Sequence, residues 1–309
     1  MDVHLRRLRA FVTVAEELHF TRAAAKLFVA QQSLSKQIAD LESEVGTPLF
    51  ERTSRRVDLT PAGEVFLAAV REALALVDRG AEEARNVGSG GHATLRVGFV
   101  AGAALELTTH ILGGFTDRFP HARVELREFG LADPTAGLAA AETDVAFIRL
   151  PCTTRGLVVH PLFTEPCVVG VSTAHPLSGR DRVRVEDLAD QPIAVGRTGD
   201  AVWRAFWTLG HRPGAARPAR LVETTSQSEE MEVVAAGMAC CLTPAAAVRY
   251  SPRPGIRFLR IEDHPGSVVA VAHRDHAGGP LVSGFVEAAA AARERAPEVV
   301  RAIESAGLS

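Results

Sequence analysis

Apolar residues near the start of the chain recur at intervals of four, three and four, which predicts a helix with one buried face. The positions on that face are Leu34, Ile38, Leu41 and Val45. A shorter helix rich in small residues precedes it, and Thr21 is expected to be the N-cap of that helix. A turn near residues 29–31 joins the two. The pattern therefore predicts a helix-turn-helix.

The face of the second helix opposite the apolar stripe is short, polar and positively charged near its N-terminal end. A recognition helix presents this end to the major groove of DNA. Arginines near residues 52–56 predict a wing that grips the DNA backbone and minor groove. The residues expected to contact DNA are Thr21, Arg22, Gln31, Gln32, Ser33, Ser35, Lys36, Arg52, Thr53, Arg55 and Arg56. An ordinary small helical bundle is the alternative interpretation of the apolar spacing alone.

A long helix is predicted from residue 61, because Thr60 is a good N-cap and Pro61 fits the first helical position. Its apolar residues alternate at three and four positions, which is the pattern of a coiled-coil seam. The seam residues expected to mediate dimerisation are Leu67, Val70, Leu74, Val77 and Ala81. Packing of this stripe on the C-terminal part of the same chain is the alternative. Glycines at 88–92 then predict a hinge.

From residue 93 the pattern changes to alternating strands and helices, which predicts an α/β domain with a largely parallel sheet. Strands are expected at 94–100, 123–129, 144–149 and 268–273, and a second set at 157–163, 166–172, 193–196, 220–223 and 239–243. Helices are expected up to about 119, around 134–141, near 200–210, 227–237 and 244–250, and up to about 292. A chain that leaves one α/β lobe, builds a second and returns predicts two lobes with a cleft between them.

The predicted organisation therefore has four parts. The winged helix-turn-helix covers residues 1–60, the linker helix 61–87, the hinge 88–92 and the two-lobed domain 93–309. Lobe I is expected at about 93–160 and 267–309, and lobe II at about 161–266.

Composition and charge limit the class of protein further. The 309-residue chain is 47% hydrophobic, which is enough for a sizeable core. It has no run of about eighteen uncharged apolar residues and no N-terminal signal-peptide pattern, so we expect a cytoplasmic protein without a membrane partner. The net charge is −3, and residues 1–60 hold nine basic against eight acidic residues. Bulk charge does not mark a DNA-binding protein here; its positive charge is local.

The cysteines and histidines offer no clear metal site. Cysteines at positions 152, 167, 240 and 241 match no zinc module and include no C-x-x-C pair. Buried free thiols are expected, with a redox switch as the alternative. His273 and His276 are the nearest histidine pair in sequence, and neither a metal site nor a cofactor is expected.

Enzymes and transport-type solute-binding proteins are the rival classes for an α/β domain. The sequence holds no G-x-S-x-G, no G-x-G-x-x-G and no P-loop motif. The acidic pair Glu229-Glu230 is interpreted as the solvated face of a helix. The N-terminal helix-turn-helix argues against a solute-binding protein. We therefore expect a protein that is neither.

The ordered string from Phe20 through the wing, together with Leu59-Thr60-Pro61-Ala62-Gly63, resembles the LysR-type transcriptional regulators. The resemblance is most specific over about residues 5–67. It implies a regulator that binds double-stranded promoter DNA and a small-molecule effector, in a domain like the type 2 periplasmic binding proteins. It also implies a homodimer that pairs into a homotetramer, with RNA polymerase as a further candidate partner. Gln32 stands where this family usually has proline, which adds a donor and an acceptor to the reading surface.

The C-terminal domain further resembles the branch of that family that regulates aromatic-compound catabolism. The matching strings are Val97–Val100, Val124–Gly130, Phe147–Leu150 and Ala174–Leu177. In that branch, hydroxyl side chains at the first helix start and just after the second strand help to hold a dicarboxylate. The corresponding residues here are Gly102 and Leu131. We therefore expect a small, partly apolar or aromatic effector with one anionic or polar end.

The effector is expected where strand ends meet helices, because such ends converge on the cleft of an open α/β sheet. The loop 197–200 offers charge, a hydroxyl and free amides near an aromatic residue, although a plain helix cap by Thr198 or Asp200 is the alternative. The expected effector-binding residues are Val100, Gly102, Ala103, Leu131, Arg149, Arg197, Thr198, Asp200, Trp203, Thr225 and Ser226.

Overall fold

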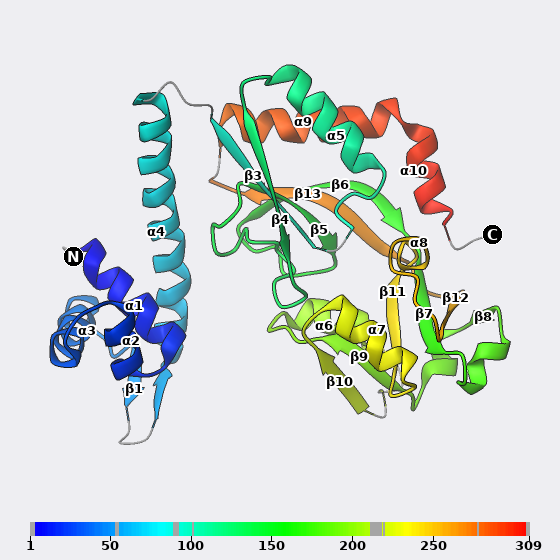
Figure 1. Cartoon of the computed structure of the whole chain (residues 1–309), viewed down its shortest axis with the longest axis horizontal. Coiled ribbons are helices and arrows are strands. Elements are labelled where there is room, and N and C mark those ends of the chain that lie inside the picture. Colours follow the sequence, from blue (N-terminus) through cyan, green and yellow to red (C-terminus); the bar gives the residue numbers. More distant parts are fainter. Residues whose placement is uncertain are drawn as a thin grey trace. The chain divides into compact units, whose positions relative to one another are not determined.

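The computed structural model describes residues 4–52, 56–88, 93–100, 102–210, 218, 220–276 and 278–306, with only the backbone described for residues 79 and 82–88. Contacts divide the chain into two compact units, one made essentially of residues 1–91 and the other essentially of residues 92–309. The predicted hinge at 88–92 lies almost entirely outside the described residues. The elements of both units are drawn in Figure 1.

The N-terminal unit consists of short helices, a two-stranded wing and one long helix. Its elements are α1 (Leu5–Glu17), α2 (Phe20–Lys26), α3 (Gln31–Val45), β1 (Phe50–Arg52), β2 (Val57–Leu59) and α4 (Pro61–Gly88). β1 and β2 pair in antiparallel fashion, with Phe50 opposite Leu59. This is the winged helix-turn-helix that the sequence predicts.

Aromatic side chains join the parts of this unit into one core. Phe11 on α1 is fully buried, and its ring centroid lies 5.3 Å from the rings of both Phe50 and Phe66. Phe20 meets Phe50 edge to face at 6.1 Å. Because Phe50 belongs to the wing and Phe66 to α4, the wing and the start of the long helix fold together with the helix-turn-helix.

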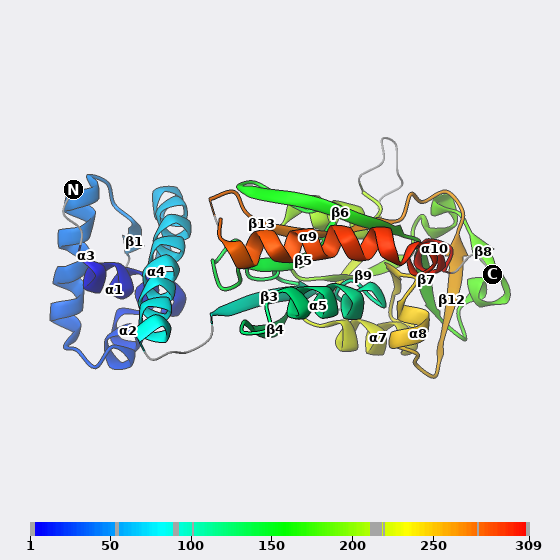
Figure 2. The same cartoon turned by 90° about the horizontal axis from the view of Figure 1, so that it is seen from above.

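The C-terminal unit contains two mixed sheets, and the first has the strand order β4-β3-β5-β13-β6. Its strands are β3 (Thr94–Val100), β4 (Arg123–Phe129), β5 (Val145–Leu150), β6 (Leu157–Glu165) and β13 (Ser267–Arg274). Its helices are α5 (Leu107–Arg118), α9 (Pro280–Arg295) and α10 (Pro297–Glu304). Figure 2 shows α5 and α9 side by side over this sheet, where the ring centroids of Phe115 and Phe285 are 5.6 Å apart.

The second sheet has the order β10-β9-β11-β7-β12-β8. Its strands are β7 (Cys167–Ser172), β8 (Arg182–Val183), β9 (Pro192–Gly196), β10 (Arg220–Thr224), β11 (Cys240–Pro244) and β12 (Ile256–Ile261). Its helices are α6 (Ala201–Trp207), α7 (Gln227–Ala235) and α8 (Ala247–Tyr250), with 3₁₀ turns at Pro176–Gly179 and Val185–Leu188. The chain crosses between the sheets after β6 and again before β13, which confirms the predicted two-lobed path.

One buried apolar cluster joins the two sheets. It includes Ile148 and Ala270 from the first sheet and Val169 and Leu242 from the second. The two lobes therefore share a core in this arrangement. Within the residues described, no helix has the length and apolar content needed to cross a membrane.

Several predicted elements differ from the structure. The strand at 157–163 is predicted in the second lobe, but β6 belongs to the first sheet, because it pairs with β13 from Leu157 to Glu165. The sheets are mixed rather than largely parallel, since β13 and β7 each run antiparallel to both neighbours. β12 and α10 are not predicted at all.

The helix predicted around 134–141 does not form. The segment is a series of turns with positive φ at Ala136, Gly137 and Ala141. The Asp133 carboxylate accepts hydrogen bonds from the backbone amides of Thr135 and Gly137 at 3.0 and 2.8 Å. An aspartate that binds nearby backbone amides in this way favours a turn over a helix.

Candidate functional site

The apolar stripe predicted for α3 is buried, with Leu34, Ile38 and Leu41 fully enclosed and Val45 partly so. The opposite face carries polar residues at the surface. These are Gln31, Gln32, Ser33 and Lys36, which are exposed, and Ser35, which is partly exposed. The burial pattern confirms the predicted division of α3 into a core face and a polar face.

Thr21 links α2 to this polar face and is not the N-cap that the sequence predicts. The cap is His19, whose Nδ1 accepts a hydrogen bond from the Thr21 amide at 3.2 Å, so α2 begins two residues earlier than expected. The Thr21 hydroxyl instead donates to Oε1 of Gln31 at 3.0 Å. This bond holds the Gln31 side chain at the start of α3 and leaves its amide N–H groups as donors.

The N-terminal end of α3 also keeps free backbone donors. Its N-cap, Ala30, has no side chain that accepts a hydrogen bond, so the first N–H groups are left for solvent or an anion such as a DNA phosphate. Phe28, in the turn before it, is 95% exposed at a φ of 54°. An exposed aromatic ring beside a recognition helix offers an apolar contact to a base. Sequence reasoning missed Phe28, since an aromatic residue between helices is normally taken as core.

Arg52, which is predicted to contact DNA, also has a structural role within the unit. Its guanidinium pairs with Glu42 at 2.7 Å and lies 4.7 Å from the centre of the Phe20 ring. The Glu42 carboxylate also accepts hydrogen bonds from the backbone amides of Leu49 and Phe50 at 2.9 and 3.1 Å. Glu42 and Arg52 therefore fix the first strand of the wing against α3 and α2.

The other predicted cations differ in what they contact. Arg22 pairs with Glu17 at 3.3 Å, and Arg56 pairs with Asp58, two residues further along the wing, at 2.7 Å, so both already have partners. Lys36 is exposed on α3 and forms no ion pair with any residue the structure describes. It is therefore the cation of the α3 polar face that remains available to DNA. The two remaining predicted contacts, Thr53 and Arg55, lie outside the described residues.

The seam predicted for α4 is divided between two faces of the helix. Val70 and Leu74 are buried against α1 in the core of their own unit, and Leu67 is partly buried beside them. An ion pair of 3.3 Å between Arg71 and Glu16 joins the same two helices. This burial corrects the assignment of Val70 and Leu74 to a subunit contact, because the chain's own helix-turn-helix already covers them.

A second row of small and apolar residues on α4 is exposed within its own unit. Its members, four residues apart, are Val65, Ala69, Ala73, Val77 and Ala81, and Leu76 lies beside them. Val65 is 75% and Leu76 63% exposed. Of the predicted seam, Val77 and Ala81 belong to this exposed row. A contiguous exposed apolar surface of this kind is typical of a site of interaction with another molecule.

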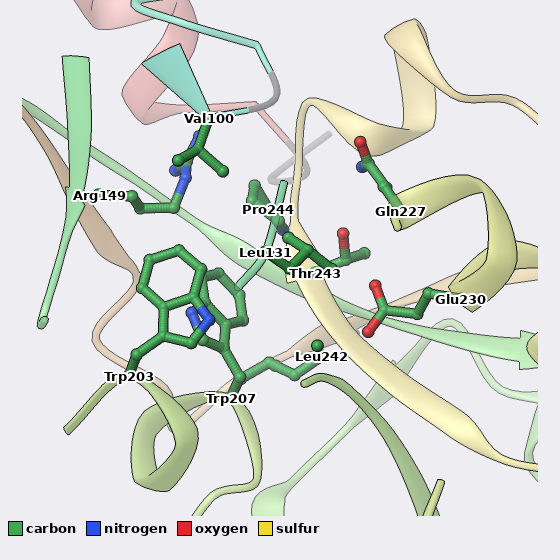
Figure 3. Close-up of a pocket in the computed structure, with 11 residues that line it drawn as sticks. Val100, Leu131, Arg149, Trp203, Trp207, Gln227, Glu230, Leu242, Thr243 and Pro244 are labelled. Atoms are coloured by element: carbon green, nitrogen blue, oxygen red, sulfur yellow. The ribbon is translucent and has the colours of Figure 1, made fainter. Parts of the chain in front are cut away.

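In the C-terminal unit, a cavity of about 50 Å³ lies where strands of both sheets end (Figure 3). Its lining from the first lobe is Val100, Leu131 and Arg149. Its lining from the second lobe is Gly196, Trp203, Trp207, Gln227, Glu230, Leu242, Thr243 and Pro244. Val100 ends β3, Gly196 ends β9 and Pro244 ends β11. Strand ends thus converge on a cavity, as expected for an α/β cleft.

Four predicted effector-binding residues line this cavity, namely Val100, Leu131, Arg149 and Trp203. Seven others do not, namely Gly102, Ala103, Arg197, Thr198, Asp200, Thr225 and Ser226. Gly102 and Ala103 form a turn with φ of 91° and 45° before α5. Arg197 pairs with Glu223 at 3.2 Å. The helix-capping alternative for the 197–200 loop is confirmed for Asp200, which accepts hydrogen bonds from the amides that start α6.

The other polar groups of the loops at 197–200 and 225–226 form hydrogen bonds within the protein. Ser226 caps α7, and the amide and hydroxyl of Thr225 donate to the Glu229 carboxylate. The Thr198 hydroxyl donates to the Ala132 carbonyl at 3.3 Å, and the Thr153 amide donates to Asp200 at 2.7 Å. The last two bonds join a loop of one lobe to a loop of the other. They fasten the lobes in the arrangement seen here.

Arg149 contributes a positive charge that is already balanced. Its Nη1 lies 2.8 Å from Glu165 and donates to the Ser267 hydroxyl at 2.8 Å. Glu165 is fully buried and also accepts a hydrogen bond from the Ala246 amide at 2.7 Å. Because breaking a buried ion pair strands a charge, this pair is a fixed part of the cavity wall.

Glu229 and Glu230 differ sharply, which corrects the interpretation of both as solvated. Glu229 is exposed, and hydrogen bonds from Thr225 lower the pKa of its carboxyl. Glu230 is only 8% exposed and lines the cavity, and burial raises the pKa of its carboxyl to about 8. The sequence carries a signal for this difference. Glu230 stands on the same helix face as the buried Met231 and Val234, at helical spacing.

The tryptophans and a glycine shape the rest of the cavity. Trp203 and Trp207 stand four residues apart on α6, with ring centroids 5.3 Å apart. Sequence reasoning found Trp203 but missed Trp207, although the same spacing on a helix points to it. Across the cavity, a Cβ at Gly196 would lie 2.5 Å from the Leu131 Cβ. Only glycine fits at 196 while the lobes keep this arrangement.

All four cysteines are buried and free, which confirms the prediction of buried thiols. Burial raises the pKa of Cys152 and Cys167 to about 12 and of Cys240 to about 11, and raises that of Cys241 well above its ordinary value. These groups are therefore protonated thiols near neutral pH. Among the described residues, no group of three or more histidine, cysteine or acidic side chains could hold a metal ion.

Comparison with known proteins gives the same two parts. Residues 5–64 match the family model described as bacterial regulatory helix-turn-helix protein, lysR family, and residues 88–294 match the LysR substrate binding domain. The regulator AlsR of Bacillus subtilis is 31% identical over 287 residues, covering 92% of this chain and 94% of AlsR. BudR of Raoultella terrigena is 33% identical over 290 residues, covering 92% of this chain and 99% of BudR. A hydrogen peroxide-bound mutant of Corynebacterium glutamicum OxyR shares 26% identity at a TM-score of 0.53, over 99% of this chain and 96% of that one.

The N-terminal unit is a winged helix-turn-helix with a polar α3 face, and the C-terminal unit has two sheets and an internal cavity. Together they define a DNA-binding protein that responds to a small molecule. The chain belongs to the LysR family of bacterial transcriptional regulators. It is a regulator of transcription and not an enzyme, and its C-terminal unit is the effector-binding domain of that family.

Proposed function

We propose that the cavity between the two sheets is the effector site of this regulator. One observation carries the proposal: residues of both lobes line the cavity, with Val100 and Leu131 on one side and Trp203 and Trp207 on the other. A ligand that touches both lobes binds different lobe arrangements with different affinity. Such a difference in affinity is what lets a ligand shift a conformational equilibrium.

The proposed effector is small, partly apolar or aromatic, and polar at one end. Val100 and Leu131 make one wall apolar, and the two indole rings make another. A dicarboxylate fits poorly, because Arg149 is already paired with Glu165 and no other cation of the described residues lines the cavity. These features and the matching sequence strings of the C-terminal domain support grouping this regulator with those that control aromatic-compound catabolism.

Peroxide sensing by a cysteine is a weaker alternative, raised by the likeness to a peroxide-bound OxyR. The thiolate, rather than the thiol, reacts with an oxidant. Each cysteine of this chain is buried with a raised pKa, so its thiolate is scarce near neutral pH. The thiols therefore favour effector binding over peroxide chemistry as the input signal.

We place the coupling between the cavity and DNA in the relative position of the two lobes. The bonds from Thr198 to Ala132 and from Thr153 to Asp200 hold the lobes together beside the cavity. An effector that closes or rotates the lobes strengthens or breaks these bonds. Movement of the lobes in each subunit then alters the spacing of the paired DNA-binding units on the operator.

The DNA is read by α3 in this proposal. Gln31 and Gln32, which are both exposed, pair with adenine edges in the major groove, and Ser35 and Lys36 lie on the same polar face. Residues 1–60 act as the reading unit and 61–87 as the dimerisation helix. The exposed α4 row from Val65 to Ala81 supplies the contact between two subunits, and two dimers join through residues 93–309. Such an assembly binds an interrupted palindrome.

The test of the effector site is Leu131→Arg in the full-length protein. DNA upstream of the protein's own gene serves as the binding target, and metabolites that shift the thermal unfolding of the wild type serve as candidate effectors. The variant should footprint the DNA as the wild type does while losing the response to those metabolites. A variant that still responds would refute the placement of the effector in this cavity.

A further inference from the structure

Two ionisable side chains line the cavity, and only one of them has a partner. Arg149 is paired with the buried Glu165. Glu230 projects from α7 toward the cavity interior (Figure 3), with 8% of its surface exposed. Its carboxyl group makes no hydrogen bond or ion pair with any part of the chain that the structure describes. Cys241, which lies close enough to influence Glu230, is a neutral thiol and supplies no charge.

An unpartnered carboxyl at this depth destabilises the folded protein, because burial removes water without supplying another hydrogen-bond donor. A bound molecule that brings a donor removes this cost. The adjacent Glu229 shows the contrast, since its carboxylate is exposed and accepts hydrogen bonds from Thr225. Glu230 is thus a carboxyl group without a partner among the described residues, and its place in the cavity wall lets a ligand supply one.

The indole rings across the cavity from Glu230 favour the same kind of ligand (Figure 3). Trp203 and Trp207 are 4% and 7% exposed, and their planes are inclined by 53°. Tryptophan faces attract cations more strongly than any other side-chain ring, and the attraction grows when water is excluded. The cavity volume of about 50 Å³ limits the ligand to a few heavy atoms unless the lobes separate.

We propose, on the premise that the cavity is the effector site, that it binds a small molecule with a positively charged nitrogen, which pairs with Glu230 and lies against Trp203 and Trp207. The charges of the cavity wall support a cation. Arg149 and Glu165 cancel, so Glu230 is the ionisable group of the cavity wall that is left without a counter-ion, and a bound cation favours its charged form. An anionic group placed there would face a carboxyl group with no free cation. A bound ammonium group also lowers the pKa of the carboxyl beside it, so both partners are charged in the complex.

The experiment compares three probes of nearly equal shape: isobutylammonium, isobutanol and isobutyrate. The full-length protein reports binding through its own fluorescence, because it contains two tryptophans and both line the cavity. Isobutylammonium should bind at least about tenfold more tightly than the other two probes. Tighter binding of isobutyrate or isobutanol would overturn the proposal, as would the absence of binding by all three.

The variant Glu230→Gln keeps the shape of the side chain and removes its charge. It should weaken isobutylammonium binding by about tenfold or more and leave isobutanol binding unchanged. Glu229→Gln, one residue away on the exposed side of α7, is the matched control and should behave as the wild type. Equal affinity for isobutylammonium in the wild type and Glu230→Gln would show that Glu230 does not hold the cation.

A third variant, Leu131→Phe, separates failure of this inference from failure of the effector site itself. It narrows the cavity without adding charge, so any probe that binds in the cavity should bind more weakly. If the preferred probe is isobutyrate and Leu131→Phe weakens its binding, the cavity remains the effector site and the cation is wrong. If Leu131→Phe leaves the binding of the preferred probe unchanged, the cavity is not the site and both proposals fall.

Discussion

Replacing Glu230 by glutamine should stabilise the C-terminal unit, by an amount that grows with pH. Burial raises the pKa of the Glu230 carboxyl to about 8, from an ordinary value of 4.5 that the unfolded chain retains. Between these pH values the folded state keeps a proton that the unfolded state has released. Stability therefore falls as the pH rises, by about 1.4 kcal/mol per pH unit. The loss sums to about 5 kcal/mol near pH 8, and glutamine, which does not ionise, removes it.

Urea unfolding of the full-length protein, at pH values from about 5 to about 9, measures this difference. Fluorescence is the readout, because Trp203 and Trp207 both lie in the C-terminal unit. The wild type and Glu230→Gln should have similar stability at the acid end and differ by several kcal/mol near pH 8. Glu229→Gln should show no such gain, since the pKa of that carboxyl is lowered. Parallel pH profiles for the wild type and Glu230→Gln would refute the account of the buried carboxyl.

Further changes test the other parts of the molecule. Gln32→Ala should change the base preferred at one or two positions in each half-site, measured by selection from random DNA. Arg55→Ala should weaken binding to every sequence and reduce the slope of log affinity against log salt concentration by about one. Leu74→Ala should lower the stability of the N-terminal unit by about 2–5 kcal/mol, measured by denaturant unfolding, because Leu74 is buried against α1. Leu76→Glu should leave that stability unchanged, because Leu76 is exposed within its own unit. It should yield monomers in sedimentation, because it puts a charge into the proposed contact between subunits. A dimeric Leu76→Glu would exclude that face of α4 as the subunit contact. Gly196→Val should force the lobes apart and weaken effector binding by about tenfold or more, measured by fluorescence titration, since a Cβ at that position meets the facing leucine.

Periodicity was enough to predict which faces of the helices are buried, because burial follows from the spacing of apolar residues within one element. It placed Leu34 and Ile38 in the core of the N-terminal unit. It also identified Val70 and Leu74 as buried positions, but it did not indicate what covers them. A stripe on a helix has the same pattern whether its own chain or a second subunit packs on it, and here α1 is the partner.

The cavity was predictable in part for a related reason. Val100, Leu131 and Arg149 follow from the rule that strand ends converge in an α/β fold, and all three line it. Trp207 and Glu230 come from helices, where exposure depends on how each helix packs on the second sheet. The loop at 197–200 was rich in polar groups, but its aspartate and threonine bind backbone groups of their own chain. A polar loop at a strand end thus has the same sequence whether it binds a ligand or fastens two lobes.

The two tryptophans permit a direct test of the claim that the cavity controls DNA binding. Full-length protein labelled with 5-fluorotryptophan contains two fluorine reporters, both in the cavity wall. A metabolite that alters operator affinity should shift both fluorine resonances in the NMR spectrum, with the same midpoint concentration as the change in DNA binding. A metabolite that alters operator affinity while both resonances stay unmoved would contradict the account.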